Sequence, residues 1–350
     1  MINFSNNSYS DDYEEYDIDS FTIPPRTCPT KLGQVSITDW VAIFQCSFTF
    51  VFGVPGNGLV LWITAFEMKR SVNTIWFQNL AVADLLCCLS APFSIMTIFL
   101  GYWPLGLFAC KFLPFILLLN MYASVLLLTM ISIDRCVLVM KPVWCQNNRS
   151  LRRAYAACVL MWILATILSS PVLIFRNIRE CNGIETCSYD YRILRHHRQM
   201  VEDLIALCRV QLGFVIPFLV IVVCYTMLTH RVKSRFTHNT KTMKVTIVVI
   251  IGFFVCWLPY HVSGTILAMN VVSSPLFKST FGLHNIFMAL AFMNSCINPI
   301  IYVLMGKDFK SKLKRSLKVI LKNVLEEQIM RSDSTKTHLS SETKSTETPI

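Results

Sequence analysis

Seven stretches of this chain are long and apolar enough to cross a bilayer. Each has about the 20 apolar residues that a helix needs to cross the hydrocarbon core. Such stretches must be helical, because lipid offers an open backbone no hydrogen-bond partner. The predicted spans lie near residues 38–65, 72–100, 107–140, 152–175, 203–231, 241–270 and 280–305. The predicted fold class is therefore an all-α membrane protein, a seven-transmembrane helix bundle.

Polar segments flank the predicted bundle of residues 38–305. Residues 1–37 are acidic and are expected to form a disordered N-terminus. They contain no basic segment followed by an apolar run, so the first span is expected to act as the insertion signal. Residues 306–322 place apolar side chains at helical spacing among lysines, which predicts a short amphipathic eighth helix on the inner leaflet. Residues 323–350 are predicted to be a disordered cytoplasmic tail.

The charge pattern predicts the orientation. The chain is 54% hydrophobic with a formal net charge of +11. In a soluble protein this charge would suggest nucleic acid, but here the basic residues follow alternate spans, as at Lys69, Arg149, Arg235 and Lys310. The positive-inside rule makes that side cytoplasmic. We expect a multi-pass plasma-membrane protein with its N-terminus outside. The arginine- and histidine-rich loop 176–202 departs from the rule and suggests an anionic ligand.

A carboxylic acid lies in the middle of the second span. Asp84 must face the bundle interior and find partners there, because ionisable groups are costly in lipid. Other spans supply Asn120, Ser124, Asn294 and Asn298. We expect a buried polar network of these residues, in which a sodium ion is the candidate ligand because its preferred ligands are oxygens.

Five motifs together resemble the rhodopsin-like G-protein-coupled receptors. They are Gly-Asn-Gly-Leu-Val-Leu-Trp from Gly56, Asn-Leu-Ala-Val-Ala-Asp-Leu-Leu from Asn79, Asp134-Arg135-Cys136, Cys256-Trp257-Leu258-Pro259-Tyr260 and Asn298-Pro299-Ile300-Ile301-Tyr302. The resemblance covers about residues 38–322. Two departures are Cys136, where the family usually has tyrosine, and the missing acid at the start of the sixth span, where Asn239 lies.

The resemblance implies how such a receptor would switch. At rest Asp134 would hold Arg135, which is freed when the cytoplasmic end of the sixth span swings out to admit a G protein. Because the acid near Asn239 is missing, no salt bridge from Arg135 to the sixth span is expected. The other implied switch positions are Tyr225, Trp257, Pro259, Asn298, Pro299 and Tyr302.

The loops favour the chemoattractant branch of this family. Lys-Pro-Val-Trp-Cys-Gln-Asn from Lys141 is similar to the complement anaphylatoxin receptors, and other segments divide between the C3a and C5a types. A formyl-peptide-like or other chemoattractant receptor is the alternative. A transporter is a distant one, because the charged residues inside the spans are too few for a relay. Phe292 and Leu117 replace the lysine of opsins and the aspartate of amine receptors.

The resemblance also implies a ligand pocket. Arg176 and Arg209 match the positions at which anaphylatoxin receptors hold the ligand's C-terminal carboxylate, and a guanidinium can pair with a carboxylate bidentately. His284 stands where the family has an aspartate that meets the ligand's terminal arginine, so strict selectivity for arginine is in doubt. Leu117 and Met288 are assigned to the same pocket.

Several modifications are expected outside the membrane. Acidic neighbours favour sulfation of Tyr9, Tyr13 and Tyr16, and an anionic segment would steer a basic ligand. Asn3 and Asn6 begin glycosylation sequons. The resemblance implies a disulfide from Cys110 to Cys187, chosen over Cys181, which is left free or pairs with Cys28.

No metal-ligand spacing, phosphate loop or nucleophile–base set is evident, so no enzyme is predicted. The expected partners are a peptide agonist such as a complement fragment, a heterotrimeric G protein of the Gi type, receptor kinases, arrestin and membrane lipids, and no nucleic acid. The serine- and threonine-rich stretch 332–348 is the expected phosphorylated segment.

Overall fold

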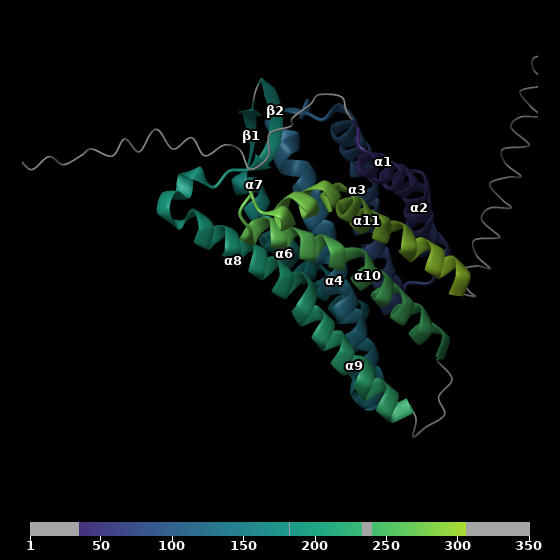
Figure 1. The fold of residues 1–350 in the computed structure, drawn as a ribbon. Helices are drawn as coiled ribbons and strands as arrows, with labels where there is room; N and C mark the ends of the chain where they lie inside the picture. The colour runs from purple at the N-terminus through teal and green to yellow at the C-terminus, as the bar shows by residue number, and fades with distance from the viewer. Residues whose placement is uncertain (1–34, 182, 233–239, 306–350) are drawn as a thin grey trace, which may run out of the picture.

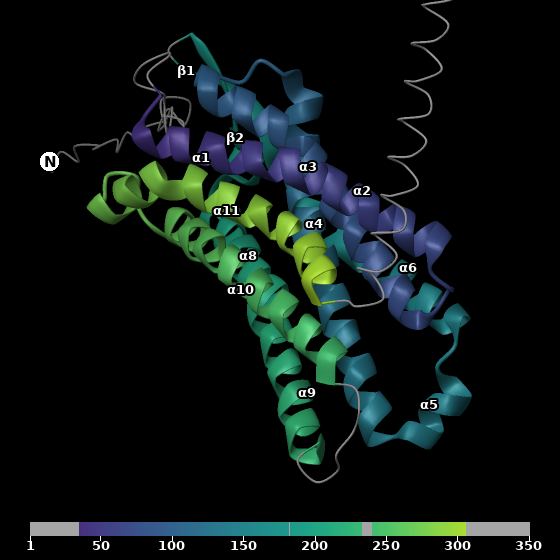
Figure 2. The ribbon, with the colours of Figure 1, turned by 90° about the vertical axis from the view of Figure 1, so that its right-hand side faces the viewer.

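The computed structural model describes residues 35–181, 183–232 and 240–305. Within these ranges, seven helical segments are long and apolar enough to span a membrane. Figure 1 shows them packed in one bundle, with the strands β1 and β2 at one end and the tip of α9 at the other. Helix α5 (Pro142–Asn148) lies at the same end as that tip (Figure 2). We call these the hairpin end and the α5 end.

The spans are built from the following elements. Span 1 comprises α1 (Ile37–Phe48), a π-helical turn (Thr49–Gly53), α2 (Val54–Trp62) and a second π-helical turn (Ile63–Glu67). Spans 2 and 3 are α3 (Val72–Leu100) and α4 (Gly106–Met140), and span 4 is α6 (Leu151–Ser169) followed by α7 (Pro171–Phe175). Span 5 comprises α8 (Arg198–Val210), a π-helical turn (Gln211–Val215) and α9 (Ile216–Val232). Spans 6 and 7 are α10 (Thr240–Met269) and α11 (Pro275–Met305).

Polar caps set several helix ends. Ser36 and Ser71 each accept a hydrogen bond from the backbone of the third helical residue, and that residue's side chain accepts from the serine's N–H in return. Ser274 accepts from the N–H of Phe277 at 3.1 Å, and Pro275 starts α11. This start precedes the predicted one at 280, because the cap lies outside the apolar run that guided the prediction.

Span 3 is the centre of the bundle. In its most apolar window 78% of the residues are buried inside the protein, against 28% in span 4. Span 4 instead exposes Val159, Ile163 and Ile167, which recur every four residues along one face of α6. Such a stripe would face the lipid. Span 3 therefore makes its contacts inside the bundle, and span 4 lies at the periphery.

Polar side chains join spans that are distant in sequence. Asn57 Nδ2 donates to the carbonyl of Ser295 at 2.8 Å and joins spans 1 and 7. Trp162 Nε1 donates to Asn79 Oδ1 at 2.9 Å and joins spans 4 and 2. In hydrocarbon these groups have no water to bond, so each contact fixes a pair of helices.

The loop between spans 4 and 5 forms an antiparallel hairpin, which was not predicted. Strand β1 (Arg176–Cys181) pairs with β2 (Ile184–Tyr189), and Arg176 lies opposite Tyr189. A disulfide joins Cys187 on β2 to Cys110 in the first turns of α4, with 5.5 Å between their Cα atoms. The pairing of Cys110 with Cys187 is therefore confirmed in the structure, and it ties the hairpin to the central span.

Replacing Cys187 by serine should lower the amount of this protein at the cell surface several-fold. The disulfide closes a loop of 77 residues, and losing such a constraint costs about 4 kcal/mol in the loop-entropy model. Surface labelling measures the effect, with Cys208→Ser as the matched control because Cys208 is free and exposed. Mass spectrometry of the non-reduced protein should recover a Cys110–Cys187 peptide; a Cys110–Cys181 peptide would show a different pairing.

Candidate ligand pocket and coupling network

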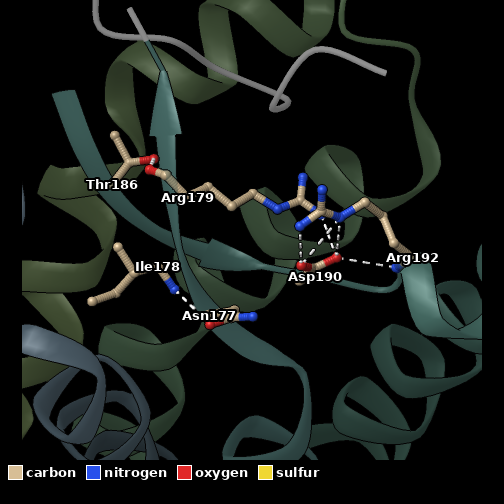
Figure 3. Close-up of polar contacts among 6 residues, drawn as sticks. All are labelled: Asn177, Ile178, Arg179, Thr186, Asp190 and Arg192. Carbon is tan, nitrogen blue, oxygen red and sulfur yellow. Dashed lines mark hydrogen bonds and ion pairs between the residues drawn. The ribbon is translucent and has the colours of Figure 1, made fainter. Parts of the chain in front are cut away.

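A carboxylate fastens the hairpin to the entrance of span 5. Asp190 accepts a hydrogen bond from Arg192 Nη2 at 2.8 Å. It also forms an ion pair with Arg179 on β1 (Figure 3). The bonds from Arg192, and then those from Arg179, hold the pKa of Asp190 well below its usual range. Asp190 therefore stays ionised at neutral pH and fixes where the hairpin lies above the bundle.

Arg176 begins β1 directly after α7 ends at Phe175. Its Nη1 donates to the carbonyl of Cys187 at 3.0 Å, and its guanidinium carbon lies 4.5 Å from the centre of the Tyr189 ring. The stacking and the hydrogen bond position the guanidinium without neutralising it. Arg176 therefore keeps a positive charge at the hairpin end, where the sequence placed it.

Arg209 lies on α8, in the half of span 5 nearest the hairpin. Its guanidinium carbon is 5.7 Å from the centre of the Tyr260 ring on α10, and its buried Nε has no hydrogen-bond partner among the described residues. Gly264 leaves room for it, because a Cβ there would lie 2.8 Å from Arg209 Nη2. A buried donor without a partner is costly, so Arg209 is poised to bind an acceptor.

His284 faces the same region from span 7. Its Nδ1 lies 3.2 Å from Ser263 Oγ, and its ring centre is 5.9 Å from that of Tyr260. Tyr260 thus links Arg209 and His284 in one cluster. Leu117 is buried in the core, and the partly buried Met288 packs against that core; their assignment to the pocket stays a prediction.

Below this cluster the structure shows a histidine that the sequence analysis missed. His261 is 2% exposed, and neither ring nitrogen has a hydrogen-bond partner among the described residues. Its ring centre is 6.4 Å from that of Trp257, which is fully buried one turn earlier on α10, with Pro259 between them. The sequence could have indicated this residue, because His261 follows Trp257 by four positions and residues four apart share a helix face.

Asp84 lies at the centre of a buried polar network. It accepts hydrogen bonds from Asn298 Nδ2 at 2.6 Å and from Asn120 Nδ2 at 3.2 Å. One helical turn from these donors, the buried Ser124 Oγ and Asn294 Oδ1 have no partner among the described residues. One carboxylate with spare oxygens nearby fits a hard cation such as sodium, which Asp84, Asn120 and Ser124 would hold.

The coupling network at the α5 end differs from the expectation that Asp134 holds Arg135. Both carboxylate oxygens of Asp134 accept from Arg149: Nε to Oδ1 at 2.8 Å and Nη2 to Oδ2 at 3.0 Å. Arg135 Nη2 donates instead to Asn73 Oδ1 at 2.9 Å. The reason is that both carboxylate oxygens of Asp134 already accept from Arg149, so Arg135 bonds to the neighbouring helix α3 instead.

The remaining predicted switch and modification residues lie on α9, on α11 or outside the described ranges. Tyr225 packs against the core from α9, whereas Pro299 and Tyr302 fall in the last turns of α11, where the Tyr302 side chain is not described. The residues outside the described ranges are Asn3, Asn6, Tyr9, Tyr13, Tyr16, Cys28, Asn239, the amphipathic helix 306–322 and the tail 323–350.

Comparison with known proteins identifies the family. The model of the 7 transmembrane receptor (rhodopsin family) matches residues 56–302. The chain is 44% identical to the C5a anaphylatoxin chemotactic receptor 1 of Oryctolagus cuniculus, an alignment that covers 91% of each chain. It is 42% identical to the C3a anaphylatoxin chemotactic receptor of Oncorhynchus mykiss, over 93% of this chain and 90% of the relative. The chain therefore belongs to the rhodopsin family of seven-transmembrane receptors, and within that family it is similar to the anaphylatoxin chemotactic receptors.

Proposed function

We propose that this chain is a cell-surface receptor for a complement anaphylatoxin peptide of the C5a or C3a type and signals through a Gi-type G protein. The names of its relatives support the ligand class. The hairpin end, with its disulfide, would face the oxidising outside together with the N-terminus. The α5 end carries Arg149, Arg152 and Arg153 and would face the cytoplasm, in keeping with the positive-inside rule.

One observation carries the proposal: two arginines at the hairpin end lack a carboxylate partner in the described residues. Arg176 is held by a carbonyl and a ring, and Arg209 by a ring, with its Nε unsatisfied. Arg176 directly follows span 4, and Arg209 lies in the half of span 5 nearest the hairpin. Bringing like charges together in a poorly hydrated pocket is costly, and an anion relieves that cost. The C-terminal carboxylate of a peptide is such an anion.

Binding at this cluster would be communicated along span 6. The cluster includes Tyr260 on α10. His261 directly follows it and Trp257 lies about one turn before it, and both side chains are buried. Pro259 removes a backbone hydrogen bond there and allows α10 to bend. A peptide that contacts the cluster better when α10 is bent outward shifts the population toward the coupling state. Sodium at Asp84, sulfated tyrosines and arrestin recruitment by the tail remain parts of the same proposal.

The proposal is tested first with a panel of agonists. Cells that express the full chain should lower cAMP or raise calcium when given C5a or C3a, and should not respond to formyl peptides. Loss of the response after pertussis toxin would support Gi, whereas resistance would point to another G protein. A response to formyl peptides alone would replace the proposal with the formyl-peptide alternative.

Arg209→Ala should reduce agonist potency by about 3 kcal/mol or more, the scale for removing one partner of a desolvated charge pair. An agonist amidated at its C-terminus should be weak on the parent receptor and lose little more on the variant, because both changes remove the same contact. Lys278→Ala, which removes an exposed positive charge on α11, is the matched control and should leave potency unchanged. If Arg209→Ala weakens the free-acid and amidated peptides equally, Arg209 does not bind the carboxylate.

His284→Asp should favour agonists that end in arginine over the same peptides without it. The substitution places a negative charge beside Ser263 and restores the charge of the family pattern. The ratio of the two potencies should rise at least about tenfold, which corresponds to 1.4 kcal/mol of added discrimination. His284→Asn keeps a polar group without the charge and should leave the ratio near the parent value. An equal rise with asparagine would assign the effect to size or hydrogen bonding.

A further inference from the structure

Arg149 occupies a constrained position between two helices. Its N–H donates to the carbonyl of Cys145 at 2.9 Å, which closes α5, and the next residue, Ser150, caps the start of α6. These bonds hold the backbone on both sides of Arg149, so the position of its Cα is fixed. It reaches 15 residues back along the chain to Asp134 at the end of span 3, so its placement depends on the folded junction and not on a neighbouring helical turn.

The Arg149 guanidinium saturates Asp134. Its bonds at 2.8 and 3.0 Å use both carboxylate oxygens, and the Asp134 side chain is only 12% exposed. A bidentate pair of this kind is stronger and more directional than a single contact. With both carboxylate oxygens bonded to Arg149, Asp134 makes no hydrogen bond to the adjacent Arg135 among the described residues.

The same guanidinium also shares an acceptor with Arg135. Arg149 Nη2 donates to Asn73 Oδ1 at 2.7 Å, and Arg135 Nη2 donates to that oxygen at 2.9 Å. Asn73 is the second residue of α3, next to the Ser71–Thr74 cap that fixes the start of this helix. Arg135 is 9% exposed and its buried Nε has no partner in the described part of the chain, so it is held by a neutral amide and retains its charge.

We propose that Arg149 is a positioning residue for G-protein coupling, which occupies Asp134 and thereby keeps the Arg135 guanidinium available to the G protein. This inference rests on the proposed coupling to a G protein. Without Arg149, Asp134 becomes a poorly hydrated carboxylate with no partner, and a buried unpaired charge is costly. The adjacent Arg135 can donate to it, because its buried Nε has no partner in the described part of the chain. Capture of Arg135 by Asp134 then withdraws it from the coupling surface.

The test is nucleotide exchange on purified Gi by the full-length receptor, at equal amounts of folded receptor, without agonist and with C5a or C3a. Arg149→Ala should lower exchange about tenfold, within the range by which residues of a coupling network alter coupling. Arg153→Ala removes the same charge from the adjoining first turn of α6, where the Arg153 side chain donates to Asn148 and not to Asp134 in the described part, and should have little effect. Arg135→Ala gives the level of a receptor without this guanidinium.

The decisive variant removes the carboxylate that would capture Arg135. Asp134→Asn in the Arg149→Ala background should restore exchange to the level of Asp134→Asn alone, whereas a loop that has merely lost its fold would not be rescued by a change on α4. Arg149→Lys, which keeps the charge and loses the bidentate geometry, should fall between parent and Arg149→Ala and guards against a variant that fails to fold. Failure of the rescue, or higher exchange in Arg149→Ala, would overturn the proposal. Nucleotide exchange without agonist does not depend on which peptide binds. If the ligand assignment is wrong, the variants still differ without agonist, and only the measurements with C5a or C3a show no response.

Discussion

Hydrocarbon offers no hydrogen bonds, so every polar group inside this bundle must find its partner within the protein. Most do, and the pairs hold the spans together: Asn57 with the Ser295 carbonyl, and Trp162 with Asn79. The groups without a partner among the described residues are therefore informative, because each such buried group calls for an explanation. Arg209 Nε and both nitrogens of His261 are among them.

The same constraint explains what the sequence could predict. Runs of about 20 apolar residues are rare by chance and force helices, so seven spans were readable without a structure. Their ends depend on caps such as Ser274, which are single polar residues outside the apolar run. The hairpin could not be read, because its short strands lack a clear alternation of buried and exposed residues. The Arg149–Asp134 pair could not be predicted either, because only the folded α5–α6 junction brings the two side chains together.

The two ends of the receptor handle charge in opposite ways. At the hairpin end Asp190 is bound by two arginines, whereas Arg176 and Arg209 have no carboxylate partner among the described residues. Positive charge is thus left over where an anionic group would arrive. At the α5 end both oxygens of the Asp134 carboxylate accept from Arg149. The neutral amide oxygen of Asn73 accepts from both Arg149 and Arg135. The first arrangement favours capture of an anion, and the second keeps a cation from being neutralised by its own chain.

These arrangements bear on what resists the outward movement of α10. The hydrogen bond that Arg135 makes in the described part of the chain runs to Asn73 on α3, so it is not lost when α10 moves. Among the described residues, α10 packs into the core through Phe253 and Trp257, which are fully buried with ring centres 6.0 Å apart. Close-packed side chains have discrete arrangements and not a continuum. An agonist can shift such an equilibrium only through contacts that differ between the two arrangements. His261 lies beside that packing, with its ring centre 6.4 Å from that of Trp257.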